Sequence, residues 1–329
     1  MSGRAVTAAG LAEFAGRRVV VMGLGRFGGG VGVTRWLAAQ GAKVVVTDLA
    51  SPESLRDSLS RLEGVPFEFV AGEHPPALLA DCDLLVVNPA VDKGRSEFFA
   101  EARRRKVPWT SEMNLFLQRC AGRIIGVTGS VGKSTTAAMI AAVLEVARAN
   151  AQLGGRVWLG GNIGRSLLED LPSIRGDDMV VLELSSFQLE DVAQIQRGPQ
   201  VAVVTNLKPN HLDRHGTLEA YYGAKRNIIR FQAPDDAVVL PADEPALSSW
   251  RTDCVRRMTT FSASEVRADL FLREGQAVFE PRGHETAAWP LFDVRDLRVP
   301  GRHNVLNALA AAGACLAAGV PPECVAGGL

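Results

Sequence analysis

The sequence predicts an α/β protein made of two doubly wound domains that follow each other along the chain. Apolar runs rich in Val, Ile and Leu alternate with helical patterns throughout. These runs are continuous rather than alternating in polarity, as in parallel strands that are buried on both faces. Two of the runs lead through a glycine loop into a helix, and 329 residues suit two domains of roughly 150 residues each.

Each element is expected where its pattern is strongest. Strands are expected at 18–22, 43–47, 67–70, 84–87, 124–128, 179–184, 201–205 and 237–240. Helices are expected at 28–40, 52–62, 96–105, 133–148, 217–231 and 303–318. Shorter β-rich pieces at 269–273 and 277–280, with turn residues between them, indicate a small antiparallel addition. A boundary placed just before the second glycine loop gives domains 1–121 and 122–329.

The composition argues against several classes of protein. Lysine plus arginine and aspartate plus glutamate both total 36, and the net charge of +0 argues against a general nucleic-acid binder. The 5 cysteines form no CxxC pair, so neither a zinc site nor a disulfide framework is indicated. No signal peptide and no run of roughly 20 apolar residues is recognisable. We therefore expect a cytoplasmic protein without nucleic-acid or membrane partners, and we expect it to be a monomer.

The first glycine loop reads GLGRFG and matches the GxGxxG pattern, with glycines at 23, 25 and 28. It follows an expected strand and opens a helix, and Asp48 ends the next strand. Such a loop lets a phosphate rest on helix N–H groups, which indicates a nucleotide or diphosphate ligand. Taken alone, it suggests a dinucleotide-dependent oxidoreductase. The alternative is that the glycines only let the helix pack tightly on its strand.

The second glycine loop, GVTGSVGKSTT from residue 126, ends like a phosphate-binding loop. Backbone N–H groups there cradle phosphate oxygens, Lys133 neutralises phosphate charge, and a hydroxyl from Ser134 or Thr135 ligates Mg²⁺. The loop departs from strict GxxxxGK[ST], because its other glycines stand at 126 and 129. Nucleotide contacts are expected from Gly129, Ser130, Gly132, Lys133, Ser134 and Thr135.

Five further residues suit such a site, although each also has a simpler interpretation. Glu183 ends a buried strand, where it faces the ligand crevice or pairs with an arginine. His211 follows another strand and is either a metal ligand through its neutral imidazole or an ordinary loop residue. Lys225 lies on the next helix, where a solvated lysine is the usual case. Asn304 and Asn307 share a helix face that suits recognition of a base edge, and an N-cap role for Asn304 is equally available.

The segments that carry these residues together resemble the Mur ligase family, in the family's order and from about residue 16 to the chain end: GVTGSVGKSTT, LELSSFQLE, TNLKPNHLDRHGT, YYGAKRNII and GRHNVLNALAA. SSFQLE and NHLDRH are most similar to the members that add D-glutamate. The glycine spacing of the second loop is the spacing of this family. The resemblance implies a Rossmann-like domain followed by a P-loop, ATP-binding α/β domain with the antiparallel addition.

The resemblance changes the interpretation of the first loop, because in this family that domain holds the UDP of a UDP-sugar peptide. It implies substrate contacts from Gly25, Arg26, Phe27, Asp48, Asn162 and His211. Asp48 matches the acidic residue near the uridine, and Asn162 a residue near the reaction centre. Arg26 and Phe27 replace small or aliphatic residues, and Asn88 begins an Asn-Pro-Ala sequence where Ser-Pro-Gly is typical.

The family chemistry implies an ordered, ATP-dependent ligation. A carboxylate of UDP-N-acetylmuramoyl-L-alanine attacks the γ-phosphate to give an acyl phosphate, and the amine of D-glutamate then expels phosphate. Two Mg²⁺ ions and Lys133 would neutralise the charge that accumulates. By resemblance, the metal ligands are Ser134 or Thr135 with Glu183 for one ion, and His211 with Lys225 for the other. ATP would also contact Asn304 and Asn307.

Lys225 would act as a metal ligand after addition of CO₂ to its amine, because the carbamate supplies an anionic oxygen that suits Mg²⁺. A guanidinium does not react in this way. With 6 lysines against 30 arginines in the chain, a lysine at this position fits the hypothesis.

The family normally has a third domain that binds the incoming amino acid, and no counterpart is found before Leu329. A fragment of a longer product is favoured over a deliberate truncation or a natural two-domain protein, and weak nucleotide binding with inefficient ligation is expected. The alternatives are a sister Mur or folylpolyglutamate-type ligase that adds another amino acid, and a non-catalytic nucleotide-binding module. A nicotinamide-dependent oxidoreductase is disfavoured, because such an enzyme would make no use of the second glycine loop.

Overall fold

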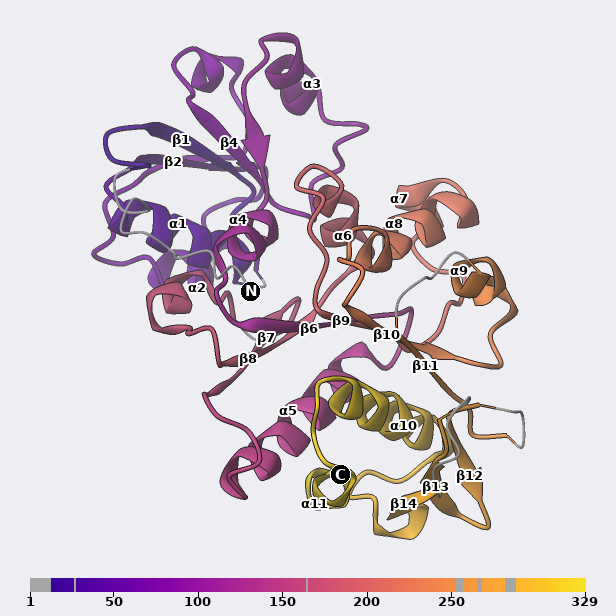
Figure 1. Cartoon of the computed structure of the whole chain (residues 1–329). Helices are drawn as coiled ribbons and strands as arrows, with labels where there is room; N and C mark the ends of the chain where they lie inside the picture. The colour runs from indigo at the N-terminus through magenta and orange to yellow at the C-terminus, as the bar shows by residue number, and fades with distance from the viewer. Residues whose placement is uncertain (1–12, 27, 164, 253–256, 265–267, 282–287) are drawn as a thin grey trace. The chain divides into compact units, whose positions relative to one another are not determined.

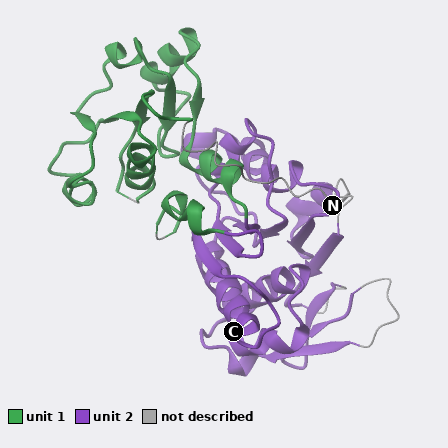
Figure 2. Ribbon diagram, turned by 60° about the vertical axis from the view of Figure 1, so that its left-hand side comes forward, with its two compact units in different colours: residues 1–121, 161–174 green, residues 122–160, 175–329 purple. Residues whose placement is uncertain are grey.

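The computed structural model describes residues 13–26, 28–163, 165–252, 257–264, 268–281 and 288–329. By its internal contacts the chain divides into two compact units (Figure 2). Unit 1 comprises Met1–Ala121 and Gly161–Ile174, and unit 2 comprises Gly122–Gly160 and Arg175–Leu329. The contiguous boundary after residue 121 would put Gly161–Ile174 in the second domain, whereas this segment belongs to unit 1. Among the described residues, no helix has the length and apolar character needed to cross a membrane.

Unit 1 is built on a five-stranded parallel sheet with the order β3-β2-β1-β4-β5. Its strands are β1 Arg18–Met22, β2 Lys43–Asp48, β3 Glu68–Ala71, β4 Leu84–Val87 and β5 Trp109–Thr110. In the register, Val20 of the central strand β1 pairs with Val45 on one side and Leu85 on the other. The first strand in the middle of this order is typical of one half of a Rossmann fold.

Unit 1 has four helices among its described residues, and two of them begin at a serine that caps a free backbone N–H group. The four are α1 Gly29–Ala39, α2 Arg56–Ser60, α3 Glu97–Arg104 and α4 Glu112–Arg119, with 3₁₀ segments η2 Pro76–Leu79 and η3 Leu168–Ser173. The Ser96 hydroxyl accepts from the Phe99 N–H at the start of α3, and Ser111 caps α4 in the same way. Phe98 and Phe99 of α3 then pack into the apolar core with the β1 and β4 side chains.

Unit 2 is built on a nine-stranded sheet with the order β14-β13-β12-β11-β10-β9-β6-β8-β7. Its strands are β6 Arg123–Thr128, β7 Val157–Gly161, β8 Met179–Glu183, β9 Val201–Val204, β10 Ala237–Pro241, β11 Arg257–Phe261, β12 Leu270–Arg273, β13 Gln276–Phe279 and β14 Trp289–Asp293. The strands from β8 through β6, β9 and β10 to β11 pair in parallel. The antiparallel pairs β12–β13 and β13–β14 continue the same sheet, which confirms the predicted addition.

Helices cover both faces of the unit 2 sheet, as its continuous apolar strands require (Figure 1). They are α5 Lys133–Ala149, α6 Ser186–Val192, α7 Leu212–His215, α8 Leu218–Arg230, α9 Ser248–Thr252, α10 Arg302–Ala317 and α11 Val325–Gly328, with 3₁₀ segments η4 Pro245–Leu247, η5 Val294–Asp296 and η6 Pro322–Cys324. α5 and α10 pack on each other on one face, and α6 and α8 do so on the other.

Helix α10 is fastened at its C-terminal end by Arg123, the first residue of β6. The Arg123 guanidinium donates to the Ala318 carbonyl at 2.8 Å and to the Ala317 carbonyl at 3.4 Å. These are carbonyls that the end of a helix leaves without a partner inside the helix. A cation at this position also complements the negative end of the helix dipole.

The predicted α/β class and all eight main strands are confirmed, and no strand end differs from its prediction by more than one residue. The strand expected at 67–70, for example, is Glu68–Ala71, and the helix expected at 52–62 forms only over Arg56–Ser60. The sequence prediction missed four strands, β5, β7, β11 and β14, and the helices α4, α6, α7, α9 and α11.

Unit 1 buries a carboxyl group, that of Glu112, in the first turn of α4. The Ser166 hydroxyl donates a hydrogen bond to its Oε1. Burial raises the pKa of Glu112 to about 7, and the hydrogen bond from Ser166 opposes this rise only in part. Ionisation of this group in the folded protein is therefore costly at neutral pH.

Replacement of Glu112 by glutamine is expected to raise the free energy of unfolding by about 3 kcal/mol above pH 7, and to change little near pH 4. Between the ordinary pKa of 4.5 and about 7, the folded state keeps a proton that the unfolded state has lost. The wild-type protein therefore loses stability as pH rises through this window. Urea denaturation of both proteins from pH 4 to 9 measures the difference.

Glu101→Gln is the matched control, because Glu101 is a helix carboxylate whose pKa is lowered by hydrogen bonds from Arg105 and Arg104. This control should bring no stabilisation above pH 7. A Glu112→Gln protein whose stability differs from the wild type by the same amount at every pH would contradict the prediction.

Candidate active site

The second glycine loop joins β6 to α5, and two of its glycines have a positive φ. Gly132 precedes α5 in the left-handed conformation, with φ of 83°, and Gly129 has φ of 152°. A Cβ at Gly129 would lie 1.9 Å from Thr205 Oγ1, and one at Gly132 would lie 2.3 Å from Asn307 Oδ1. Both positions therefore require glycine, for conformation and for space, which explains the spacing of this loop.

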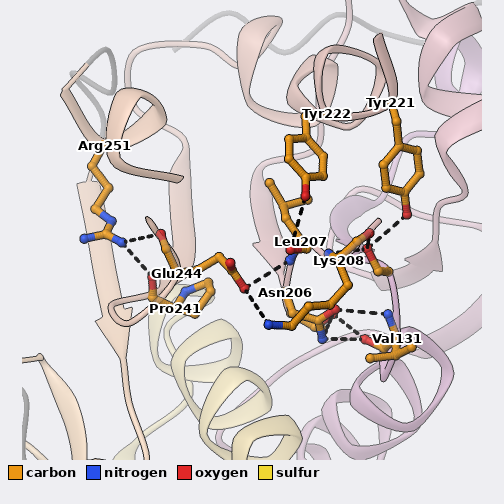
Figure 3. A network of polar contacts seen from close by, with 11 residues as sticks. Val131, Asn206, Leu207, Lys208, Tyr221, Tyr222, Pro241, Glu244 and Arg251 are labelled. Atoms are coloured by element: carbon orange, nitrogen blue, oxygen red, sulfur yellow. Dashed lines mark hydrogen bonds and ion pairs between the residues drawn. The ribbon is translucent and has the colours of Figure 1, made fainter. Parts of the chain in front are cut away.

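The loop is held by a segment that follows β9, residues 205–208, which we call the brace. The Asn206 side chain bonds both main-chain groups of Val131: its Oδ1 accepts the N–H at 3.1 Å, and its Nδ2 donates to the carbonyl at 2.9 Å (Figure 3). The Thr205 hydroxyl donates to the same carbonyl at 2.7 Å. The Ser130 N–H donates to the Asn206 carbonyl at 3.1 Å. These contacts hold the loop in place from within the protein.

Glu183 and Ser134 meet at the start of α5. The Ser134 hydroxyl donates to Glu183 Oε2 at 2.6 Å, and Glu183 itself is buried at the end of β8. Lys133 donates to the Ser130 carbonyl at 3.3 Å, so its ammonium folds back over the loop. Burial lowers the pKa of Lys133, and the nearby Glu183 carboxylate opposes that shift. A carboxylate, a hydroxyl and a lysine thus stand together where a nucleotide phosphate would rest.

Lys225 lies on α8 with 2% of its surface exposed, so it is not the solvated helix lysine of the simpler interpretation. Its Nζ donates to the Gly129 carbonyl at 2.8 Å and lies 4.9 Å from the centre of the Tyr221 ring. Burial, and to a smaller extent the charge of Lys133, lower the pKa of Lys225 to about 7, although the nearby Glu183 carboxylate opposes this shift. A substantial fraction of this amine is therefore neutral and nucleophilic near pH 7.

His211 is exposed and precedes the four-residue helix α7 in a left-handed conformation, with φ of 51°. A non-glycine residue in this region carries strain and is held there by its surroundings. The Phe187 ring of α6 lies 5.2 Å from the His211 ring and 5.0 Å from the parallel His215 ring. The His211 ring also lies 6.3 Å from the Tyr221 ring. His211 and Lys225 therefore flank the same tyrosine.

The two asparagines of α10 form a chain of hydrogen bonds beside the loop. Asn307 Nδ2 donates to Asn304 Oδ1 at 3.1 Å, and Asn304 Nδ2 donates to the Pro300 carbonyl at 2.8 Å. Asn304 is not the N-cap, because Gly301 occupies that position. Asn307 lies close to Gly132, so this face of α10 borders the second glycine loop.

In unit 1, the first glycine loop is organised by Asp48. The Gly25 N–H donates to Asp48 Oδ2 at 3.0 Å, and the Ala50 N–H donates to Oδ1 at 2.9 Å. Asn88 Nδ2 donates to the Gly23 carbonyl at 3.1 Å, so the unusual Asn-Pro-Ala sequence packs on this loop. Arg26 is exposed at the loop.

Two predicted substrate contacts of unit 1 remain to be placed. Phe27 lies outside the described residues. Asn162 is exposed, directly after β7.

Sequence reasoning missed the residues that hold the loop in place, namely Thr205, Asn206 and Tyr221. The signal for the first two lay in the TNLKPN segment after β9, since side chains at strand ends face the ligand crevice. Tyr221 stands four residues before Lys225, on the same helix face, and only that spacing pointed to it.

The described residues contain no group of three or more His, Cys, Asp and Glu side chains that could hold a metal ion. The Ser134–Glu183 pair nevertheless supplies a hydroxyl and a carboxylate oxygen, which are the hard donors that Mg²⁺ prefers. A Mg²⁺ ion with further ligands from water and phosphate fits this donor set.

Comparison with known proteins shows which family has this architecture. Residues 127–315 match the profile of the Mur ligase middle domain, and residues 17–109 match that of the MurD-like N-terminal domain of Mur ligases. The UDP-N-acetylmuramoylalanine–D-glutamate ligase of Symbiobacterium thermophilum is 40% identical over 301 residues, which cover 90% of this chain and 63% of that protein. The enzyme of the same name from Roseiflexus sp. is 39% identical, over 89% of this chain and 62% of its own length.

Among solved structures, a UDP-N-acetylmuramate:L-alanyl-γ-D-glutamyl-meso-diaminopimelate ligase from Neisseria meningitides shares the fold, with a TM-score of 0.65 at 21% identity. The match covers 96% of this chain and 98% of that one. The chain spans less than two thirds of the length of the two curated relatives named above. Because the middle-domain profile matches more than half of the residues, this chain belongs to the Mur ligase family.

Proposed function

We propose that the protein is an ATP-dependent amide ligase of peptidoglycan precursor synthesis that adds D-glutamate to UDP-N-acetylmuramoyl-L-alanine. The observation that carries this proposal is the pair of lysines, Lys133 and Lys225, whose ammonium groups lie against the carbonyls of Ser130 and Gly129 in the second glycine loop, with Glu183 buried beside it. The two relatives of about 40% identity that carry this activity in their names support the choice of substrate.

In this proposal, the substrate carboxylate attacks the γ-phosphate of ATP, and an acyl phosphate and ADP form. The amine of D-glutamate then attacks the acyl carbon, and phosphate leaves with the bonding electrons. The first step brings an anion toward a polyanion, so it needs positive charge and N–H donors in place beforehand. Lys133 and the N–H groups at the start of α5 supply both.

Ser134, with Thr135 beside it, and Glu183 would hold one Mg²⁺ ion, and His211 together with a carbamate on Lys225 would hold a second. Bound Mg²⁺ would neutralise phosphate charge during transfer. The carbamate forms when the neutral Lys225 amine adds to CO₂ and releases a proton. The lowered pKa of Lys225 makes the neutral amine available for this reaction.

In this proposal the two units divide the binding of substrates. Gly25, Arg26, Phe27 and Asp48 of the N-terminal domain, residues 1–121, would contact the UDP moiety, and Asn162 the substrate near the reaction centre. The domain at 122–329 would bind ATP through its phosphate loop, with Asn304 and Asn307 at the base. Since ATP is a cytoplasmic metabolite, we also propose that the protein works in the cytoplasm, and that it does so as a monomer.

The test is a rapid-quench measurement of ADP formation from ATP, Mg²⁺ and UDP-N-acetylmuramoyl-L-alanine by the 329-residue protein. Slow ADP formation that requires the UDP substrate is expected, with acceleration by D-glutamate but not by L-alanine or meso-diaminopimelate. Acceleration by another amino acid would indicate a sister ligase. Binding of ATP without any ADP formation would overturn the ligase proposal and indicate a non-catalytic module.

A further inference from the structure

Ser130, in the middle of the phosphate loop, has all of its polar groups engaged within the protein. Its Oγ donates to the Lys208 carbonyl at 2.7 Å, accepts from the Lys208 N–H at 2.8 Å and lies 3.0 Å from the Tyr221 hydroxyl. Its N–H donates to Asn206, and its carbonyl accepts from Lys133. The residue is 7% exposed. Ser130 therefore anchors the loop to the brace, and no free group of its side chain faces a ligand.

The direction of each hydrogen bond at Ser130 follows from simple accounting. A serine hydroxyl has one hydrogen and two lone pairs. The Lys208 carbonyl can only accept, so it takes the hydrogen, and the Lys208 N–H can only donate, so it takes one lone pair. The second lone pair is left for Tyr221, whose hydroxyl must donate. The Tyr221 hydroxyl is thus the group that completes the anchor.

Tyr221 is itself held rigidly. It is 1% exposed and is among the largest fully buried side chains of the chain's described part. Its ring lies 5.3 Å from the His215 ring on one side, and the Lys225 ammonium lies 4.9 Å from its centre. Figure 3 shows the rings of Tyr221 and Tyr222 pointing from α8 toward the brace. A rigid donor fixes the position of its acceptor better than a mobile one.

We propose that Tyr221 is a positioning residue for nucleotide binding, whose hydroxyl holds Ser130 so that the N–H groups at the start of α5 are aimed at the phosphates. This inference rests on the proposed ATP-dependent function of the same loop. It assigns Ser130 to the support of the loop instead of to direct contact with nucleotide.

The test compares binding of Mg²⁺·ADP to the wild-type protein and to Tyr221→Phe by isothermal titration calorimetry. Phenylalanine keeps the ring, and with it the packing against His215 and Lys225, but removes the hydroxyl. The dissociation constant is expected to rise roughly tenfold, because Ser130 is no longer held in place and the N–H groups at the start of α5 are less well aimed at the phosphates. The melting temperature without nucleotide is measured on the same samples, and we expect it to move little.

Tyr222→Phe is the matched control, since it makes the same change one residue away. The Tyr222 hydroxyl lies 3.5 Å from the Leu207 carbonyl, too far for a strong hydrogen bond. Its binding constant should equal that of the wild type. Ser130→Ala removes the acceptor, so adding Tyr221→Phe to it should cause no further loss if the two groups act as one pair.

Each outcome decides a specific point. Weaker ADP binding in Tyr221→Phe, with no further effect in the Ser130→Ala background, supports the inference. Wild-type affinity in Tyr221→Phe overturns it, as does a loss that is equally large in both backgrounds or in Tyr222→Phe. A lower melting temperature with unchanged affinity would assign Tyr221 a structural role only and so overturn the inference. Two outcomes for the wild-type protein separate the inference from the proposed function. If the wild type binds no nucleotide, both are overturned. If it binds nucleotide but forms no ligation product, only the proposed function is overturned.

Discussion

Replacement of Lys225 by arginine is expected to lower substrate-dependent ADP formation by roughly 10³-fold, while nucleotide binding stays within a few-fold of the wild type. Arginine keeps the positive charge next to the Gly129 carbonyl, but it cannot add CO₂ and cannot become an anionic oxygen ligand. Rapid-quench ADP measurements give the rate, and calorimetry with Mg²⁺·ADP gives the affinity. Circular dichroism checks that the larger side chain is accommodated at this buried position.

Two further variants make this prediction specific. Lys208→Arg is the matched control, because Lys208 is largely exposed and its ammonium contacts only the Glu244 carboxylate at 3.9 Å among the ion pairs of the described residues. It should retain the wild-type rate. In Lys225→Ala, added formate or acetate should restore part of the rate by replacing the carbamate oxygens. Near-wild-type turnover in Lys225→Arg would remove the carbamate from the proposal.

Replacement of Gly129 by alanine is expected to abolish measurable ADP binding and to lower the free energy of unfolding by roughly 2–4 kcal/mol. The new Cβ would lie 1.9 Å from Thr205 Oγ1 and 3.2 Å from the Asn206 nitrogen, so the loop and the brace cannot both stay in place. The φ of 152° adds strain for any side chain. Urea denaturation and calorimetry on the same preparation separate the two effects.

Gly223→Ala is the control for this change. Gly223 lies inside α8, and a Cβ there would meet no atom within 4 Å. Because alanine is a better helix former than glycine, the variant should be more stable by about 0.5–1 kcal/mol and should bind ADP normally. A Gly129→Ala protein with the wild-type denaturation midpoint and affinity would show that the loop adapts, contrary to the observed packing.

The fold was predictable where strands are buried on both faces, because burial leaves a continuous apolar signal in the sequence. β8 and β9, for example, are buried at every position. β7 and β5 escaped prediction for different reasons: β7, at the end of its sheet, has only one fully buried residue, and β5 has only two residues in all. β5 is defined by its pairing with β4, which lies far away in sequence. Such a strand leaves no local pattern.

Helix α6 carries a signal that was available in the sequence. Ser185 and Gln188 form a capping box, in which each side chain bonds the other residue's backbone N–H. This serine–glutamine spacing is a known mark of a helix start. The Ser185–Gln188 spacing therefore predicts the start of α6 at Ser186.

The candidate site was predictable only for the residues that carry a motif. The phosphate loop placed Lys133 and Ser134, and the strand end placed Glu183, since these follow from local spacing. The burial of Lys225 was not predictable, because it depends on how α8 lies against β6. That the Tyr221 hydroxyl donates to Ser130 was not predictable either. It depends on where the brace lies, and the brace is some 15 residues away, in a loop whose position no repeating pattern in the sequence indicates.

The double attachment of α10 has a consequence for the thermodynamics of ligand binding. Arg123 ties the C-terminal end of this helix to the first residue of β6, and the Asn307–Gly132 contact ties its other half to the end of the loop that β6 feeds. Strand, loop and helix are thus joined at both ends, and tilting the loop would require Asn307 or α10 to move with it. Little conformational entropy is then left to lose when a nucleotide binds, so more of the contact energy remains as affinity.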